Sequence, residues 1–268
     1  MTKKRKISNT VRKGLIATML FSIILTSCSE DEGDDSTKDG DKVGKVVFRE
    51  DFNDPVIDEN VWRIGTWSEH GGQLGRDRCF VKDGYLNLLF INDNGKFRSS
   101  AIQSKDEFLY GKWEVRLKPA SVPGVLNSFY TIDWDDRQVN GDADGSKQEI
   151  DIEFLTRSFT PDNGKVHFAV HASGLSSFET KPDIELGFNP SDDFHVWAIN
   201  ITSEFIEWSV DGKVLQTYKY NEQDIRIDKP YSLKLNHWSA VNWVQGPPES
   251  GVKCEYLIDW IQFTTYDD

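Results

Sequence analysis

The segment 148–155, Gln-Glu-Ile-Asp-Ile-Glu-Phe-Leu, alternates acidic and apolar side chains from Glu149 to Phe154. Successive side chains of a β-strand point to opposite faces, so this pattern predicts a strand with its carboxylates on one face and Ile150, Ile152 and Phe154 on the other. The apolar face belongs in a core. Three like charges on the opposite face are locally unfavourable, and no basic residue lies between them. We therefore expect this strand both to build a β-sheet and to carry chemistry.

The same alternation continues through the chain on either side of this strand. Residues 112–118 and 206–210 place Trp, Val, Leu or Ile at every second position, and the turn dipeptides between such stretches are Asp83-Gly84, Asn94-Gly95, Asn163-Gly164 and Asp211-Gly212. From residue 46 onward we find no internal repeat and no helical stripe of 12 or more residues. The predicted fold class is all-β, a sandwich of two packed antiparallel sheets.

Composition excludes several classes of protein. The 268 residues carry a formal charge of −13, so nothing in them would neutralise nucleic-acid phosphates. Nine Trp and 12% aromatic residues argue against disorder, and three Cys are too few for a disulfide scaffold. Spacing leaves open whether Cys79 and Cys254 pair or stay as buried thiols. Neutral ligands that stack on aromatic rings, such as sugars, best fit a chain with a negative net charge and many aromatic residues.

The first 27 residues have the composition of an export signal. A basic start precedes the apolar run Leu15–Leu25, which is too short to span a bilayer as a stable helix. The following Leu-Thr-Ser-Cys at 25–28 resembles the bacterial lipobox, which implies lipidation of Cys28; ordinary secretion with a chance Cys is the alternative. Several acyl chains would anchor the protein stably.

A polar, acidic stretch follows the lipobox. Residues 28–45 cannot bury apolar surface, so we expect a flexible tether there and a single catalytic domain over 46–268. An acidic run directly after a lipidated Cys resembles the surface-export signal of Bacteroidetes lipoproteins. The expected location is the bacterial outer membrane, facing the cell surface; a solvated linker in the periplasm is the alternative.

The carboxylates of segment 148–155 suit glycoside hydrolysis. Four residues of strand separate the Cα atoms of Glu149 and Glu153 by about 13 Å. If both side chains lean inward, their carboxyl groups come to roughly 5–6 Å, the separation of a retaining mechanism with a covalent glycosyl-enzyme. Asp151 between them would orient the nucleophile and help keep the pKa of the acid raised. An ordinary solvated sheet face and calcium ligation are the alternatives, although a flat strand rarely wraps a cation.

The motif Glu-Ile-Asp-Ile-Glu-Phe-Leu resembles the catalytic signature of glycoside hydrolase family 16, a β-jelly-roll family with a concave substrate cleft. The resemblance implies that Glu149 is the nucleophile, that Asp151 assists it and that Glu153 is the acid/base. Further segments resemble the family in order and spacing, and together they cover about residues 46–265: 48–53, 104–118, 194–197, 206–213 and 256–261.

The signature here lacks the extra residue that makes a β-bulge in laminarinases, agarases and carrageenases. That places the chain nearer the lichenases and the xyloglucan-active enzymes. The sequence also departs from lichenases at the stretch 145–147, at Gln103, and at Ala169 and His171. The substrate cleft is therefore not expected to copy a lichenase cleft.

Sugars stack on aromatic rings and hydrogen-bond polar groups at the ring edge. The residues expected to bind substrate are Trp67, Tyr130, Trp134, His167, His171, Asn236, Trp238 and Trp243. Plain core packing is the alternative for each Trp, and a structural role the alternative for each His. By their alternating positions, four further tryptophans are expected in the core: Trp113, Trp197, Trp208 and Trp260.

No cofactor is expected for catalysis. The family resemblance implies a structural Ca²⁺ held by Asp51 (or Glu50), the Gly84 carbonyl and Asp259, and oxygen-only ligation suits that ion.

These inferences define one main expectation and several alternatives. The chain is expected to be a monomeric, retaining endo-β-glycanase that hydrolyses a β-1,3-1,4- or β-1,3-glucan and touches the membrane only through its lipid. A transglycosylase and a galactan- or xyloglucan-active hydrolase of the same family are alternatives. A non-catalytic glycan-binding lipoprotein is the alternative from another class, although a lectin gains nothing from two carboxylates in a dry cleft.

Overall fold

The computed structural model describes residues 44–69, 72–132, 148–172, 178–220, 227–239 and 241–266. They belong to one compact unit, Lys42–Asp268. The expected leader, Cys28, most of the tether and Trp134 lie outside the described residues. The all-β class is confirmed, because the only helices in the described ranges are two short 3-10 turns, η1 (Arg76–Arg78) and η2 (Thr156–Ser158). Within the same ranges, no helix has the length and apolarity needed to cross a membrane.

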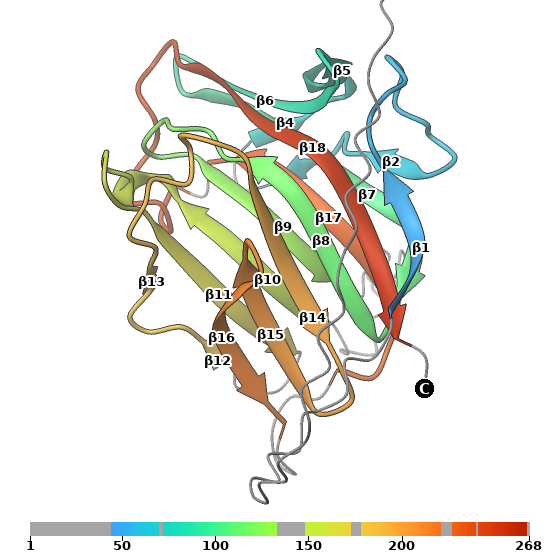
Figure 1. Cartoon of the computed structure of the whole chain (residues 1–268). Helices are drawn as coiled ribbons and strands as arrows, with labels where there is room; N and C mark the ends of the chain where they lie inside the picture. The colour runs from blue at the N-terminus through green and yellow to red at the C-terminus, as the bar shows by residue number, and fades with distance from the viewer. Residues whose placement is uncertain are drawn as a thin grey trace, which may run out of the picture. The chain divides into compact units, whose positions relative to one another are not determined.

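The first sheet is built around its last strand. β18 pairs with β8 along one edge and with β6 and β1 along the other, and β14, β15 and β16 extend the sheet beyond β8. The strands of this sheet are β1 (Gly44–Glu50), β5 (Cys79–Lys82), β6 (Tyr85–Asp93), β8 (Gly111–Lys118), β14 (His195–Ile201), β15 (Phe205–Val210), β16 (Lys213–Lys219) and β18 (Lys253–Tyr266). Figure 1 shows this sheet in front of the second one.

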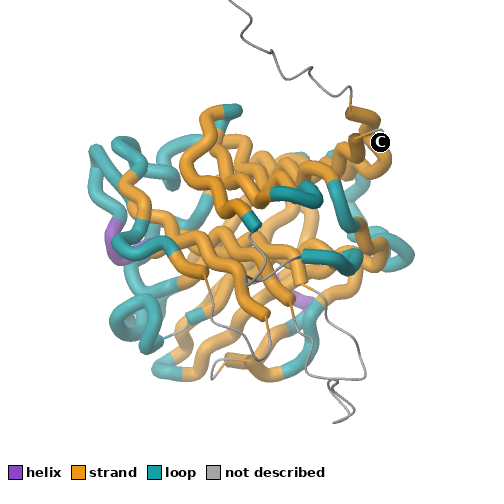
Figure 2. Tube along the Cα trace, turned by 90° about the horizontal axis from the view of Figure 1, so that it is seen from below, coloured by secondary structure: helices purple, strands orange, loops and turns teal. Residues whose placement is uncertain are grey.

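The second sheet has β10 near its middle. Its pairing order is β2-β7-β17-β9-β10-β11, with the short β12 and β13 beside β11. The strands are β2 (Trp62–Ile64), β7 (Lys96–Phe108), β9 (Leu126–Ile132), β10 (Gln148–Leu155), β11 (Lys165–Ala172), β12 (Phe178–Glu179), β13 (Ile184–Glu185) and β17 (Tyr231–Trp238). β7 also pairs with β6 and so joins the two sheets, while β3 (Ser68–Glu69) and β4 (Gly72–Leu74) lie at its start. Figure 2 shows how much of the unit is strand.

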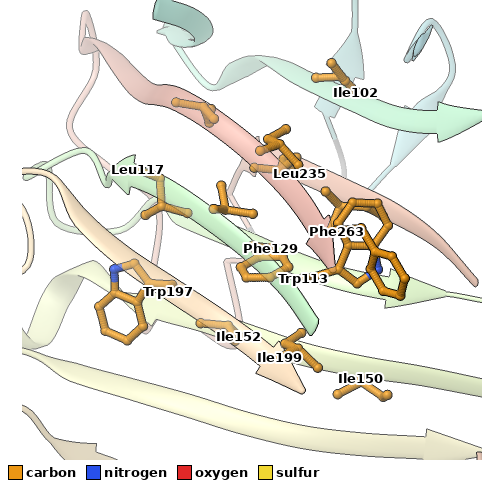
Figure 3. Packing of buried hydrophobic residues seen from close by; sticks show 14 of the residues in the cluster. Ile102, Trp113, Leu117, Phe129, Ile150, Ile152, Trp197, Ile199, Leu235 and Phe263 are labelled. Atoms are coloured by element: carbon orange, nitrogen blue, oxygen red, sulfur yellow. The ribbon is translucent and has the colours of Figure 1, made fainter. Parts of the chain in front are cut away.

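The core lies between the two sheets. Trp113 and Trp197 from the first sheet face Phe129, Ile150 and Ile152 from the second, and all five are fully buried (Figure 3). Fully burying an Ile or Phe side chain contributes about 1.5–3 kcal/mol. The apolar face predicted for the acidic strand is therefore the face that fastens β10 to the core.

Three of the four predicted turn dipeptides form two-residue hairpin turns. Asp83-Gly84, Asn94-Gly95 and Asp211-Gly212 have positive φ at both residues and join consecutive antiparallel strands. Asn163-Gly164 is different, because Gly164 is not in the left-handed region and precedes β11 instead of closing a hairpin. A Cβ at Gly164 would lie 2.5 Å from Pro190 Cδ, so the glycine lets the Pro190 ring lie close to the backbone.

The prediction for Trp260 is wrong. Trp113, Trp197 and Trp208 are buried as expected, but Trp260 is only half-buried and lies under the Arg49 guanidinium, 4.3 Å from its ring centroid. The register of β18 against β8 shifts between Ile258 and Trp260, and this irregularity interrupts the alternation on which the prediction rested.

The structure also answers the question that spacing left open for the two cysteines. Cys79 and Cys254 are both free thiols. Burial raises the pKa of each to about 12, which keeps both protonated and unreactive.

Candidate active site

Strand β10 runs between β9 and β11 with no shift of register on either side. Glu149 lies opposite His171 and Ile132, Asp151 opposite Ala169 and Tyr130, and Glu153 opposite His167 and Ser128. Directly opposite residues share a face of an antiparallel sheet. We call the face that carries Glu149, Asp151 and Glu153 the carboxylate face. β10 has no bulge, so the signature keeps its strict alternation.

The other side of β10 is held from the opposite sheet. Ile150, Ile152 and Phe154 are fully buried, and the indole nitrogen of Trp208 on β15 donates a hydrogen bond of 3.0 Å to the Asp151 carbonyl. Trp208 itself stacks on Phe168 of β11, with centroids 5.4 Å apart. A hydrogen bond between sheets at the middle acidic residue limits movement of the strand that carries the three carboxylates.

Glu153 has the electrostatics of a proton donor. Burial and the negative charge of Glu149 raise the pKa of Glu153 from 4.5 to about 7, and the charges of Glu179 and Asp183 add to this. Such a carboxyl is still partly protonated at neutral pH. Asp151, which is buried, has the His171 imidazole 3.5 Å from its carboxylate. Two acidic groups on one face, one of them holding a proton, are the requirement for general acid and nucleophilic catalysis.

Several predicted substrate-binding residues join the carboxylate face along β9 and β17. Asn236 is fully buried, and its amide is already used: Ser128 donates to its oxygen, and it donates to the Tyr130 hydroxyl at 3.3 Å. Tyr130 and Trp238 are also buried, whereas Trp67 is half-buried. The structure thus brings Tyr130, Asn236 and Trp238 together on β9 and β17, beside β10 on the same sheet, but buries all three.

Lys234 is a residue of this face that the sequence interpretation missed. Its side chain is 3% exposed, and its ammonium lies 5.1 Å from the Trp67 ring centroid, 5.4 Å from that of Tyr130 and 5.9 Å from that of Trp238. Cations are attracted to the faces of aromatic rings at these distances. Period-two alternation from Asn236 would have placed Lys234 on the same face, so the signal was present in the sequence. Three rings expected to stack on sugar therefore share one internal cation.

Trp243 and the two histidines border the acidic strand on its other side. Trp243 is 40% exposed, and its ring packs edge-to-face on His167, which lies directly opposite Glu153. A side-chain hydrogen bond from Trp243 lowers the pKa of Glu153. The loop that carries Trp243 is fastened by Arg157 of η2, which donates from Nε to the Val244 carbonyl at 3.1 Å and from Nη2 to the Gly246 carbonyl at 3.3 Å. His167 is buried beside Trp243, and His171 is the more exposed of the two histidines.

The residues expected to hold calcium are engaged elsewhere. Asp51 accepts hydrogen bonds from Arg49, at 2.9 Å from Nε, and Asp259 is ion-paired with Arg116. No group of three or more His, Cys, Asp or Glu side chains in the described part of the chain is arranged to hold a metal ion. With both carboxylates facing guanidinium groups, these residues do not fit a calcium site as they stand. The calcium ion stays a prediction, and no step of the chemistry depends on it.

Together, the fold and the site define a class of protein: a β-sandwich with three carboxylates on one strand of its second sheet, one of which has a raised pKa. The family model "Glycosyl hydrolases family 16" matches residues 61–262. The chain belongs to this family of glycoside hydrolases.

Two bacterial relatives agree with this assignment. The chain is 31% identical over 192 residues to a beta-glucanase of Paenibacillus polymyxa, covering 69% of this chain and 73% of the relative. It is 34% identical over 220 residues to a beta-glucanase of Bacillus amyloliquefaciens, covering 76% and 84%.

Solved structures share the fold. A β-1,3-1,4-glucanase (lichenase) derived from a mouse hindgut metagenome is 27% identical, with a TM-score of 0.65 over 81% of this chain and 97% of that one. A laminarinase catalytic domain from Thermotoga petrophila is 22% identical, with a TM-score of 0.69 over 85% and 100%, and supports the fold alone. The expected jelly-roll architecture is confirmed.

Proposed function

We propose that the protein is a retaining endo-β-glucanase that cleaves β-1,3-1,4- or β-1,3-linked glucan. The observation that carries this proposal is Glu153, whose pKa is raised to about 7 by burial and by Glu149 on the same unbulged strand. The names of the relatives support a glucan as substrate, and the unbulged strand supports the mixed-linkage glucan as the first candidate.

The mechanism follows from the two carboxyl groups. In the first step, a Glu149 oxygen bonds to the anomeric carbon while the glycosidic C–O bond breaks, and the Glu153 proton passes to the leaving oxygen. In the second step, the Glu153 carboxylate takes a proton from water. That water oxygen bonds to the anomeric carbon and releases Glu149, so Glu153 regains its proton and the configuration is retained. Asp151, with His171 beside it, is placed to orient Glu149.

A polysaccharide panel with product sizing tests the substrate. We expect wild-type enzyme to release short oligosaccharides from barley β-glucan or laminarin, with rapid loss of viscosity because cleavage is internal. Xyloglucan and agarose serve as comparisons for the other substrates of the family. Product chains longer than the substrate would indicate transglycosylation. Inertness toward both glucans, with turnover of agarose or xyloglucan, would overturn the glucan assignment and leave the enzyme class intact.

We also propose that the protein is a lipoprotein anchored to the bacterial outer membrane through Cys28, with the domain facing the cell surface. The lipobox-like residues 25–28 and the acidic stretch after them support this location.

Labelled palmitate tests the lipid anchor. We expect incorporation into wild type and none into Cys28→Ser, and we expect added protease to remove the domain from intact cells. Equal labelling of both chains would overturn the lipid site, and protection from protease in intact cells would overturn the surface location.

A further inference from the structure

Beside Glu153 lies a histidine–aspartate pair that the mechanism above does not use. His167 on β11 is 2% exposed, and its Nδ1 is 2.8 Å from the Asp183 carboxylate. A carboxylate only accepts hydrogen bonds, so Nδ1 must carry the proton and donate it. The pair therefore fixes both the tautomer and the ring orientation of His167.

The His167 ring in turn supports Trp243. The two ring centroids are 4.8 Å apart, with planes at 78°, an edge-to-face contact. Trp243 is the partly exposed indole whose hydrogen bond lowers the pKa of Glu153, and the His167 ring on which it packs lies directly opposite Glu153 across the β10–β11 pair. Arg157 fastens the loop around Trp243 through backbone carbonyls. The contact with His167 is thus the ring contact that orients the Trp243 side chain from the sheet below it.

We propose that His167 and Asp183 are positioning residues, which hold the Trp243 indole beside the carboxylate of Glu153. This inference rests on the proposed role of Glu153 as acid/base. Asp183 orients the His167 ring, the His167 ring supports the Trp243 indole, and the indole lowers the pKa of Glu153. His167 is therefore assigned to the support of the acid/base instead of to a sugar hydroxyl.

The charged and titratable groups around Glu153 set the sign of the expected effect. They are Glu149 and Asp151 on β10, His167 on β11, Glu179 on β12 and Asp183 just before β13, with Lys181 paired to Glu179 at 2.6 Å. Burial, Glu149, Glu179 and Asp183 all raise the pKa of Glu153, whereas the hydrogen bond from Trp243 lowers it. Losing that hydrogen bond must raise the pKa and move the alkaline limb of the activity profile to higher pH.

A double-mutant cycle on the pH dependence of kcat/KM tests the proposal. Trp243→Phe removes the donor, and we expect the alkaline limb to move up by about 0.5–1 pH unit. His167→Phe keeps an aromatic ring but loses the bond to Asp183, and we expect a shift in the same direction. The double variant should shift no further than Trp243→Phe alone, because both changes break one chain of contacts.

Asp183→Leu tests the direction in which the pKa of Glu153 moves. It is also a second variant in case His167→Phe does not fold. Removing the Asp183 charge alone would lower the pKa of Glu153 and move the limb down, whereas loss of positioning moves it up. We expect an upward shift. The matched control is Asp211→Asn, because Asp211 pairs with His195 at 2.7 Å with the same sequence separation of 16 residues on the first sheet; its profile should superimpose on wild type.

A direct titration of Glu153 by ¹³C NMR, assigned with Glu153→Gln, reports its pKa without turnover. An unchanged pKa in His167→Phe, a downward shift in Asp183→Leu, or additive shifts in the double variant would each overturn the positioning role. If instead the pKa moves as expected but the activity limb does not follow it, Glu153 is not the acid/base, and the proposed function fails while the positioning role stands.

Discussion

Glu149→Ala is expected to reduce hydrolysis of β-glucan by at least about 1,000-fold, because the covalent intermediate can no longer form. The strand itself should survive the change, since β10 is fastened through Ile150, Ile152 and the Trp208 hydrogen bond on the opposite face. Removing Glu149 also removes a negative charge beside Glu153. The variant should therefore fold and bind substrate but not turn it over.

Chemical rescue distinguishes a lost nucleophile from a damaged fold. Added azide fits the space left by the carboxylate and should attack the anomeric carbon of an activated aryl glycoside, which gives a product of inverted configuration. Product anomers are read by NMR. Glu185→Ala is the control, because Glu185 is an exposed carboxylate of the same sheet and pairs with Lys165 at 3.1 Å. This variant should keep wild-type activity.

Two outcomes would contradict this assignment. Full activity in Glu149→Ala would exclude Glu149 as the nucleophile. Glycan binding by wild type with no turnover of any polysaccharide would favour the non-catalytic glycan-binding lipoprotein over the enzyme.

Glu153→Gln is expected to lose about 100- to 10,000-fold in kcat/KM on glucan, because no group is left to protonate the leaving oxygen. The loss should be much smaller for an aryl glycoside whose phenolate leaves without a proton, since the first step then needs no acid. The measurement is kcat/KM on both substrates. An equal loss on the two would place the role of Glu153 elsewhere than in leaving-group protonation.

The same variant should be more stable than wild type in alkaline solution. Between pH 4.5 and about 7 the folded protein keeps a proton on Glu153 that the unfolded chain has released, so this group makes the free energy of unfolding fall as pH rises through that window. Glutamine removes the cost of burying the charge, which we place at about 1–3 kcal/mol at pH 8.

Melting temperatures measured at pH 4 and pH 8 check the stability effect. We expect a gain for Glu153→Gln of several degrees at pH 8 and little difference at pH 4, where Glu153 is neutral in both states. A variant that melts at the wild-type temperature at both pH values would contradict the raised pKa of Glu153.

The acidic strand shows how much of the structure a local sequence pattern can predict. Alternation alone assigned Ile150, Ile152 and Phe154 to the core and grouped Glu149, Asp151 and Glu153, because the side-chain period of a strand does not depend on its neighbours. The turns at Asp83-Gly84, Asn94-Gly95 and Asp211-Gly212 were predictable for a similar local reason, whereas Asn163-Gly164 does not close a hairpin. Trp260 was not, because a register irregularity in β18 is decided by what its neighbours require.

The environment of the carboxylates could not be predicted from pattern. Asp183, Trp243 and Glu153 are far apart in sequence, and the raised pKa of Glu153 depends on burial that only packing produces. The burial of Asn236 and the aromatic surroundings of Lys234 also arise from β7, β9 and β17 lying side by side.

What the sequence determined by itself is the fold class, the family and the strand that bears the acidic groups, since each depends on residue type and local spacing. The family resemblance already pointed to Glu153 as the acid/base, but only the tertiary structure showed what raises its pKa and which side chains surround it. Electric fields and desolvation act across space, and they depend on distances between strands that no local pattern contains.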